Sequence, residues 1–360
     1  MVDGGGNGGA VAHPDTRSPG RRRTASKRIA PVSSLPPTRM KDQLVTRLFR
    51  SDEPSVRFKI AANVLGKKLE SAEVRGIQKE VKSSLRVKTL LSGRDADGRI
   101  PLHPYAKWYG AHWVLADLAD IGYPRGDETL IALREHVYEW LLSRSHEKRI
   151  KSIDGRVRRC ASQEGNALYY LLVLGLADER TEHLKERLLG WQWPDGGWNC
   201  DKNPKAVNSS FMETLIPLRA LALHAHLADD RRSLRAAKRA AEVFLKRRLY
   251  KKQKDGRIIS KNFVILHYPC YWHYDVLFGL KVMAEAGFIG DRRCRDALEL
   301  LENKRLPDGG FPAEGKYYRI TERAQTGRSL VDWGGVSRKR MNEFVTADAL
   351  FVLKKSGRLT

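Results

Sequence analysis

Apolar positions along the chain recur with helical spacing. In segments 130–141 and 234–245 they fall at i, i+3, i+7, i+10 and i+11, which forms one stripe of an α-helix. Segment 74–85 repeats this stripe more loosely. The opposite face of 234–245 carries Lys and Arg. Because only one side of each segment is apolar, the pattern predicts helices that lie on the outside of the fold with one face in water.

A second set of segments is apolar nearly all round. It comprises 167–175, 276–280 and 344–353, and helices of this kind are buried in globular proteins. Segment 52–67, with Pro54 as a suitable first helical residue, can supply another buried helix. Strand patterning is nearly absent, and no Gly-rich phosphate loop follows a strand, which argues against a doubly wound nucleotide-binding fold. The sequence therefore predicts an all-α protein.

An Asp-Gly pair separates the two kinds of helix. Each pair follows an outer-helix pattern and precedes a buried one, so outer helix, turn and buried helix form a unit that occurs about five times between residues 74 and 358. Such units can stack as an open solenoid or close into a ring. The pairs begin at Asp97, Asp154, Asp195, Asp255 and Asp308.

The most specific local motif is Gln192-Trp-Pro-Asp-Gly-Gly-Trp198, which has a weaker copy at Leu306-Pro-Asp-Gly-Gly-Phe311. Proline stops the helix, and glycine permits a positive φ at a tight turn. The closing aromatic ring can fold back over the preceding polar side chain. We therefore expect the motif to fasten neighbouring repeats.

This pattern resembles the QW repeat of squalene and oxidosqualene cyclases, which also occurs in degenerate form in protein prenyltransferase β subunits. The resemblance covers roughly residues 74–358 and implies an α/α toroid, a barrel of about five to six helical hairpins with inner and outer helix rings. In that family the motif is structural. We accordingly expect Gln192, Asp195 and Trp198 to stabilise the fold.

Residues 1–40 differ from the rest of the chain. They are rich in Gly, Pro, Ser and Arg, with few bulky apolar residues to offset the entropy of ordering, so a disordered tail is expected. The basic cluster in 21–28 could touch an anionic surface, although a solvated tail is the preferred interpretation. Residues 41–360 are expected to form a single toroid domain.

The chain is strongly basic, with 66 Lys and Arg against 42 Asp and Glu and a formal net charge of +24. This charge favours an anionic partner without identifying one. The four cysteines are too few and too widely spread for a disulfide scaffold, and the longest apolar run is too short to span a bilayer. A cytoplasmic protein without a transmembrane segment is expected.

The catalytic signatures of the resembled family have no credible match. These are the Asp-x-Asp-Asp motif that protonates squalene in the cyclases and the Asp-Asp-x-x-Asp motif for diphosphate and magnesium. Protein prenyltransferases hold zinc with a His and an Asp-x-Cys pair, whereas this chain has Asn199-Cys200-Asp201. The site predicted from sequence therefore contains no metal.

A zinc site remains the one cofactor hypothesis with support from the residues. Cysteines precede three buried helices and would gather at one end of a closed ring, and His267, Cys270 and His273 follow at three-residue intervals. Small buried cysteines without metal are the preferred interpretation. The three cysteines are Cys160, Cys200 and Cys270.

Polar and aromatic residues gather where the buried helices begin. In a closed ring these ends would surround the mouth of a cavity. Acid–base candidates are His112, Glu164, Glu213, His273 and Asp275. Aromatic faces can hold a prenyl chain and stabilise a carbocation. The substrate-binding candidates are Trp108, Trp113, Asn166, Phe211, Tyr271, Trp272, Tyr274 and Glu343. Helix capping by the carboxylates and core packing by the aromatics are the alternatives for each residue taken alone.

The leading functional hypothesis is a terpenoid cyclase or prenyltransferase-like protein. It would bind an isoprenoid or similar small apolar substrate in a central cavity and catalyse its cyclisation or transfer. One alternative is a carbohydrate-active α/α toroid, a glycosidase or lyase with Glu164 and Glu213 as its carboxylate pair. Another is a non-enzymatic, basic helical-repeat scaffold that binds nucleic acid or an acidic protein through its outer faces, although nucleic acid is not the expected partner.

Overall fold

The computed structural model of the chain describes residues 37–359, and within them the protein is mostly helical. The all-α prediction is therefore confirmed. Only two pairs of two-residue strands occur in this part of the chain, β1 with β2 and β3 with β4. Their bounds are Ser152–Ile153, Arg156–Val157, Arg319–Ile320 and Arg328–Ser329. The tail predicted over residues 1–40 lies outside the described residues except for 37–40, which belong to the first helix.

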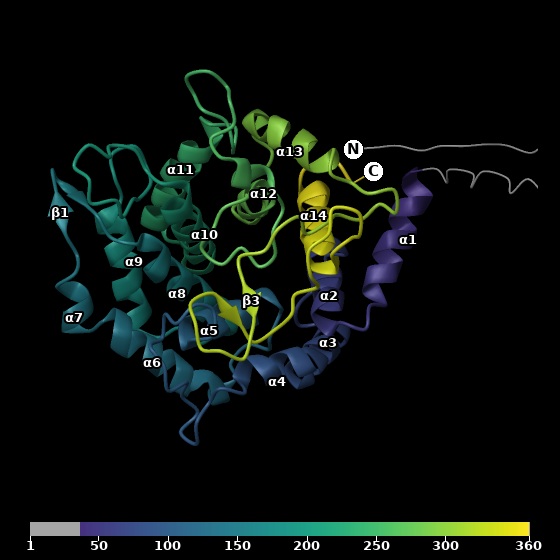
Figure 1. Ribbon diagram of the computed structural model, residues 1–360, viewed down its shortest axis with the longest axis horizontal. Helices are drawn as coiled ribbons and strands as arrows, with labels where there is room; N and C mark the ends of the chain where they lie inside the picture. The colour runs from purple at the N-terminus through teal and green to yellow at the C-terminus, as the bar shows by residue number, and fades with distance from the viewer. Residues whose placement is uncertain (1–36, 360) are drawn as a thin grey trace, which may run out of the picture. The chain divides into compact units, whose positions relative to one another are not determined.

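The helices fall into an outer and an inner set, which Figure 1 shows along the periphery and nearer the middle. The outer set is α1 (Pro37–Phe49), α3 (Ala72–Ser83), α4 (Leu85–Leu91), α6 (Ile131–Leu141), α7 (Arg144–Glu147), α9 (Arg180–Trp191), α11 (Arg231–Leu245) and α13 (Arg295–Glu302). The inner set is α2 (Pro54–Phe58) with the π-helix η1 (Lys59–Val64), α5 (Ala111–Asp120), α8 (Ala161–Leu174), α10 (Phe211–Ala228), α12 (Val276–Glu285) and α14 (Glu343–Lys355). Short 3₁₀ turns are η2 (Glu128–Leu130), η3 (Lys261–Val264) and η4 (Arg292–Cys294).

From α5 onward, each inner helix packs on the next inner helix along the chain. Helix α5 contacts α8, α8 contacts α10, α10 contacts α12, and α12 contacts α14. Helix α14 in turn contacts η1 and α2, which come from the start of the described chain. The outer helices α3, α6, α9, α11 and α13 pack on α2, α5, α8, α10 and α12 respectively.

Side-chain composition explains which helices are buried. Helix α11 presents a stripe of small and aromatic residues to its neighbours, including Ala237, Ala241 and Phe244, while Arg235 and Lys238 on its other side are exposed. Helix α10 has buried residues on every side. Burial of apolar area drives this sorting, since about 25 cal/mol is gained for each Å² removed from water.

The five Asp-Gly pairs all lie between an outer and an inner helix, as predicted. In every pair the glycine adopts a positive φ, from 68° to 106°. Gly196 has little room for a side chain, because a Cβ atom there would lie 2.3 Å from the carbonyl oxygen of Arg239. A side chain at this turn would therefore push α11 away from it.

The QW-like motif ties three helices together. The Gln192 amide donates hydrogen bonds to the carbonyl oxygens of Gly196 and of Ala236 in α11, each at 2.8 Å. Asp195 accepts from the backbone N–H and the hydroxyl of Ser209, which precedes α10. The Trp198 indole donates to the Leu188 carbonyl in α9 at 3.0 Å. The three polar groups thus hold the turn.

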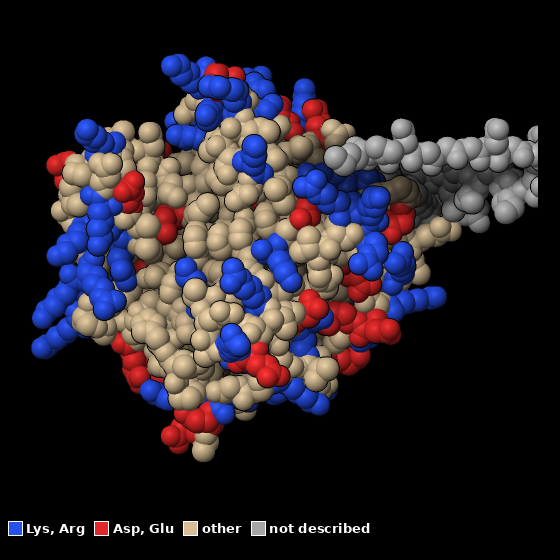
Figure 2. Space-filling view, in the orientation of Figure 1, with Lys and Arg blue, Asp and Glu red and all other residues tan. Residues whose placement is uncertain are grey.

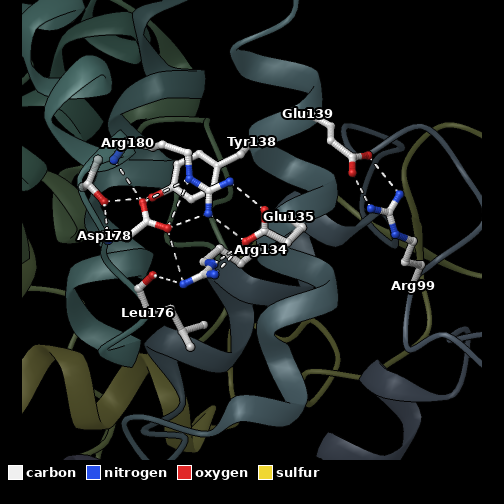
Figure 3. Close-up of polar contacts among 9 residues, drawn as sticks. Arg99, Arg134, Glu135, Tyr138, Glu139, Leu176, Asp178 and Arg180 are labelled. Atoms are coloured by element: carbon white, nitrogen blue, oxygen red, sulfur yellow. Dashed lines mark hydrogen bonds and ion pairs between the residues drawn. The ribbon is translucent and has the colours of Figure 1, made fainter.

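Ion pairs link outer helices at the surface. Arg180, at the start of α9, donates to Glu135 of α6 and to Asp178, and its guanidinium carbon lies 4.2 Å from the centre of the Tyr138 ring (Figure 3). Arg134 shares the same Glu135 carboxylate at 2.6 Å. Exposed pairs of this kind contribute about 0–1 kcal/mol each, so this network reinforces a contact between helices that burial has already formed.

Lys and Arg side chains gather along the edge of the molecule that carries β1 and α7 and around the loop between α11 and α12 (Figure 2). Between them lies a face with few charges. In the described part of the chain, no helix is both long enough and apolar enough to cross a membrane.

Candidate functional site

A small cavity lies among the inner helices. Its walls come from α5, α8, α10, α12 and α14 and from the loop 267–271, and its volume is about 70 Å³. Ligand sites ordinarily measure about 300–1,000 Å³, so this cavity is nearly filled by its own side chains. The lining residues are Trp113, Ala116, Asp117, Asp120, Asn166, Tyr169, Ile216, Arg219, His267, Tyr268, Pro269, Cys270, Tyr271, Leu277, Phe278, Lys281 and Asp348.

A buried ion cluster forms one side of this cavity. Lys281 of α12 lies 2.7 Å from Asp120 of α5 and 2.9 Å from Asp348 of α14. Lys59 of η1 bridges the same two carboxylates at 2.8 and 3.0 Å. The Tyr268 hydroxyl donates to Asp120 at 2.8 Å. Four segments of the chain are therefore joined by one set of charges.

Asp120 stays ionised within this cluster. Burial alone would raise the pKa of the Asp120 carboxyl, but the ammonium groups of Lys281 and Lys59 outweigh burial and hold that pKa well below its usual range. Arg219 of α10 adds a further cation 3.8 Å from Asp120 and also pairs with Glu285 at 2.5 Å. The charges of the cluster are thus largely balanced.

Asp117 lies one turn earlier on the same face of α5 and has a different environment. Its side chain is buried, and its Oδ2 accepts no hydrogen bond from the residues that the structure describes. Burial, followed by the negative charge of Asp120, raises the pKa of the Asp117 carboxyl well above its usual range. Asp117 therefore faces the cavity in surroundings that favour the protonated form of its carboxyl.

Aromatic rings pack together beside Asp117. The Tyr271 ring stacks on that of Trp108 with the two centres 4.0 Å apart, and Trp113 meets Trp108 edge-on at 4.6 Å. Trp113 and Tyr271 line the cavity, together with Tyr169 and Phe278. Of the residues predicted from sequence, Trp113, Asn166 and Tyr271 reach the cavity.

His112 lies behind this wall. It is fully buried, its Nδ1 lies 3.2 Å from the Tyr170 hydroxyl, and its Nε2 lies 3.3 Å from the Asn166 amide. Burial lowers the pKa of His112 to about 3, so the ring is neutral at pH 7. Its position supports Asn166, which contacts the cavity.

Glu164 forms a separate buried pair. Its Oε1 lies 2.8 Å from Nε2 of His146, and both side chains are almost completely excluded from water. Arg187 of α9 lies 3.8 Å from the same carboxylate. The sequence analysis did not include His146, which sits in α7, a helix of only four residues without a clear periodic signal.

Glu213 lies in the first turn of α10, where the structure also places two of the cysteines. Oε2 of Glu213 accepts the backbone N–H of Ser162 at 3.0 Å. The Sγ atoms of Cys160 and Cys200 and a Glu213 carboxylate oxygen all lie within 4.8 Å of one another. Burial raises the pKa of Glu213. A hydrogen bond with Cys160, burial and the nearby Glu213 raise the pKa of Cys200.

Tyr105 borders this cysteine cluster. Burial raises the pKa of the Tyr105 phenol, and the charges of Glu213, Cys160 and Cys200 raise it further. Its ring lies 5.2 Å from that of Trp113, which lines the central cavity.

Asp275 acts as the N-cap of α12. Its carboxylate accepts the Phe278 N–H at 2.8 Å and the His267 N–H at 2.7 Å. Cys270 contacts the same carboxylate at 3.4 Å, so the third cysteine belongs to this cap and not to the cluster at Glu213. The His273 ring stacks on Tyr317 at 3.6 Å, and burial lowers the pKa of His273 to about 4.

The remaining predicted residues contact other parts of the protein. Phe211 and Tyr274 pack on each other at 4.9 Å and on Phe244 in the core. Trp272 stacks on His273 at 4.0 Å. Glu343 accepts a hydrogen bond from the Ser51 hydroxyl at 2.7 Å.

The charged residues inside the inner helices were not predicted from the sequence. Each interrupts an otherwise apolar pattern, as in Ala-Asp-Leu-Ala-Asp of α5, and a charge in a buried helix must be paired or shift its pKa. That signal was present in the sequence but was not used. The missed residues are Lys59, Asp117, Asp120, Arg219, Lys281 and Asp348.

Comparisons with known proteins give no family assignment, because no family model and no curated protein matches this sequence.

Proposed function

We propose that the chain is an α/α toroid that binds an isoprenoid or similar apolar chain in its central cavity and protonates it through Asp117. The order of helix contacts supports the ring, since each inner helix from α5 to α12 packs on its successor and α14 packs on η1. The Lys59–Asp120 ion pair then links η1 to α5, where the series of inner helices continues.

The buried Asp117 carboxyl, which lines the cavity and whose Oδ2 has no hydrogen-bond partner among the described residues, is the observation that carries the proposal. A carboxylic acid that keeps its proton at neutral pH can act as a general acid. Its O–H proton would form a new C–H bond with the π electrons of a substrate double bond, which leaves a carbocation on the substrate and a carboxylate on Asp117. Later loss of a proton from the product cation restores the acid.

The aromatic wall suits such an intermediate. Ring faces carry negative electrostatic potential and attract a cation within about 6 Å of the ring centre. Trp113, Tyr169 and Tyr271 line the cavity that Asp117 faces. In this proposal they stabilise the carbocation, and Asn166 orients the substrate with support from His112.

Substrate entry requires the cavity to expand. At about 70 Å³ it holds a few water molecules at most, far less than a prenyl chain occupies. The loop 267–271 is the one wall that is not part of an inner helix. We propose that this loop moves outward when substrate binds.

The carbohydrate alternative has less support. Glu164 and Glu213 are both buried, and neither is among the residues that line the central cavity. Each carboxylate already contacts protein groups, His146 in one case and the Ser162 N–H in the other. Sugar chemistry would instead need both carboxylates beside an open groove.

The test is product formation. Purified protein is incubated with squalene and with farnesyl and geranylgeranyl diphosphate, and the extracts are analysed by mass spectrometry. Asp117→Asn should abolish product formation while the protein stays folded, whereas Asp255→Asn in an exposed turn should not affect it. If no substrate is converted, no isoprenoid co-purifies and no prenyl diphosphate shifts the melting temperature, the proposal is abandoned.

A further inference from the structure

Three side chains with metal-binding chemistry converge from the start of α8, the loop after the QW-like motif and the first turn of α10. Cys160 immediately precedes α8, Cys200 follows the QW-like motif, and Glu213 lies in the first turn of α10. Their ligand atoms lie within 4.8 Å of one another, with Sγ of Cys200 3.5 Å from Oε1 of Glu213. None of the four cysteines, all of which the structure describes, forms a disulfide.

The backbone around the cluster is held in place by other contacts. Arg158 and Asn199 pair through an isolated parallel bridge, which sets the two cysteine segments side by side. The buried Arg158 guanidinium donates to the carbonyl oxygens of Asp201 and Ala206 at 2.7 and 3.1 Å and so fixes the loop that carries Cys200. The positions of both thiols are therefore determined by the scaffold.

The Glu213 carboxylate is oriented as well. Its Oε2 accepts the Ser162 N–H at 3.0 Å, which leaves Oε1 directed toward Cys200. Metal-binding carboxylates and imidazoles are usually held by such an outer hydrogen bond, which fixes the ligand atom before the ion arrives. The cluster thus has three potential ligands, and a hydrogen bond from Ser162 orients one of them, Glu213.

We propose that Cys160, Cys200 and Glu213 bind a zinc ion. Two thiolates and one carboxylate form a donor set that zinc accepts, whereas magnesium and calcium prefer oxygen ligands alone. Zinc–sulfur bonds of about 2.3 Å at tetrahedral angles place ligand atoms about 3.7 Å apart. The Cys200 and Glu213 atoms are already 3.5 Å apart, and all three ligand atoms lie within 4.8 Å of one another, so only small shifts are needed. Three protein ligands leave the fourth position open to water or to a ligand.

The zinc site does not depend on the proposed function. None of its three ligands lines the central cavity, and Asp117 is not part of it. A protein that binds zinc but converts no isoprenoid, or the reverse, would therefore separate the two proposals.

The first measurement is zinc content and affinity in the full-length, reduced protein. We expect one zinc ion per chain. Cys160→Ser and Cys200→Ser should each weaken zinc binding at least about 100-fold, because loss of a direct ligand should cost no less than the largest effect of losing an outer hydrogen-bond partner. Cys270→Ser is the matched control, since this thiol contacts Asp275 instead, and it should leave stoichiometry unchanged.

Cobalt substitution in the unaltered protein provides a second measurement that does not require the variants to fold. Two thiolate ligands should give a strong thiolate-to-cobalt charge-transfer absorption, and added zinc should abolish it. The proposal is overturned if the reduced protein binds neither ion, if Cys160 and Cys200 are recovered only as a disulfide, or if Cys270→Ser weakens binding as much as Cys200→Ser.

Discussion

Asp117 and Asp120 show how two carboxyl groups on one helix face acquire opposite properties. The pKa of Asp120, which lies beside Lys59 and Lys281, is held well below its usual range, whereas burial without such a partner raises the pKa of Asp117 well above that range. Sequence spacing predicts that residues three apart share a helix face, but it does not reveal which of the two meets a lysine. Which carboxylate meets a lysine is decided by contacts between residues far apart along the chain, since Asp120 is 161 residues from Lys281 and 61 residues from Lys59.

Replacement of Asp117 should change how stability depends on pH. Because the folded-state pKa is raised, the carboxyl destabilises the folded protein increasingly as pH rises above about 4, by up to about 1.4 kcal/mol per pH unit. Asp117→Asn removes this penalty, so its stability advantage over the unaltered protein should grow between pH 5 and pH 7. Urea unfolding at both pH values measures it, and parallel pH profiles would refute the assignment.

The lowered pKa of His112 predicts the opposite dependence of stability on pH, with stability rising as pH rises. Its pKa of about 3 in the folded protein lies below its unfolded value of about 6.5, so stability is complete above pH 6.5 and is lost as pH falls toward 3. His112→Gln should flatten this loss, while His183→Gln on the exposed face of α9 should not. Unfolding measured at pH 7 and pH 5 tests the difference; equal slopes in all three proteins would contradict it.

At the scale of elements, the sequence was most informative where local chemistry sets the structure. The Asp-Gly turns and the alternation of outer and inner helices were predicted because glycine conformation and helical periodicity act within a few residues. The structure adds a repeated detail. The hydroxyl of Thr214 accepts the Trp198 N–H, and that of Thr346 accepts the Phe311 N–H, so both copies of the motif end on the next inner helix.

The QW-like motif provides a stability prediction. Gln192→Ala removes two hydrogen bonds that tie α9 to the turn and to α11, and it leaves the Ala236 carbonyl without that donor. We expect a loss of about 1–3 kcal/mol in the free energy of unfolding. Gln43→Ala on the exposed side of α1 should cost much less. Similar losses for the two variants in urea unfolding would show that the motif does not fasten the repeats.

At the scale of the whole molecule, the ion cluster and the cavity arise from residues that the chain brings together only after folding. Lys59 and Asp348 are 289 residues apart and come from the first and last inner helices. Buried charges that remain paired hold their helices in one arrangement, but removal of one partner leaves an uncompensated charge. The positions of the inner-helix charges can be read from the sequence, but their pairing across such separations, unlike the turns, cannot.

Lys281→Met should destabilise the protein by about 3–5 kcal/mol, because Asp120 and Asp348 would then share Lys59. The double variant Lys281→Met with Asp348→Asn keeps one cation opposite one carboxylate and should be less destabilised than the single variant. A double-mutant cycle measured by urea unfolding gives the coupling between the two residues. Additive losses would show that they do not interact.

Deuterium incorporation tests the central claim most directly. The Asp117 proton exchanges with solvent between turnovers, so a reaction carried out in D₂O with squalene or a prenyl diphosphate should transfer one deuterium to carbon, and mass spectrometry of the product should show it. Asp117→Asn should yield no such product. A product without deuterium on carbon, or one that forms equally well with Asp117→Asn, would contradict the account.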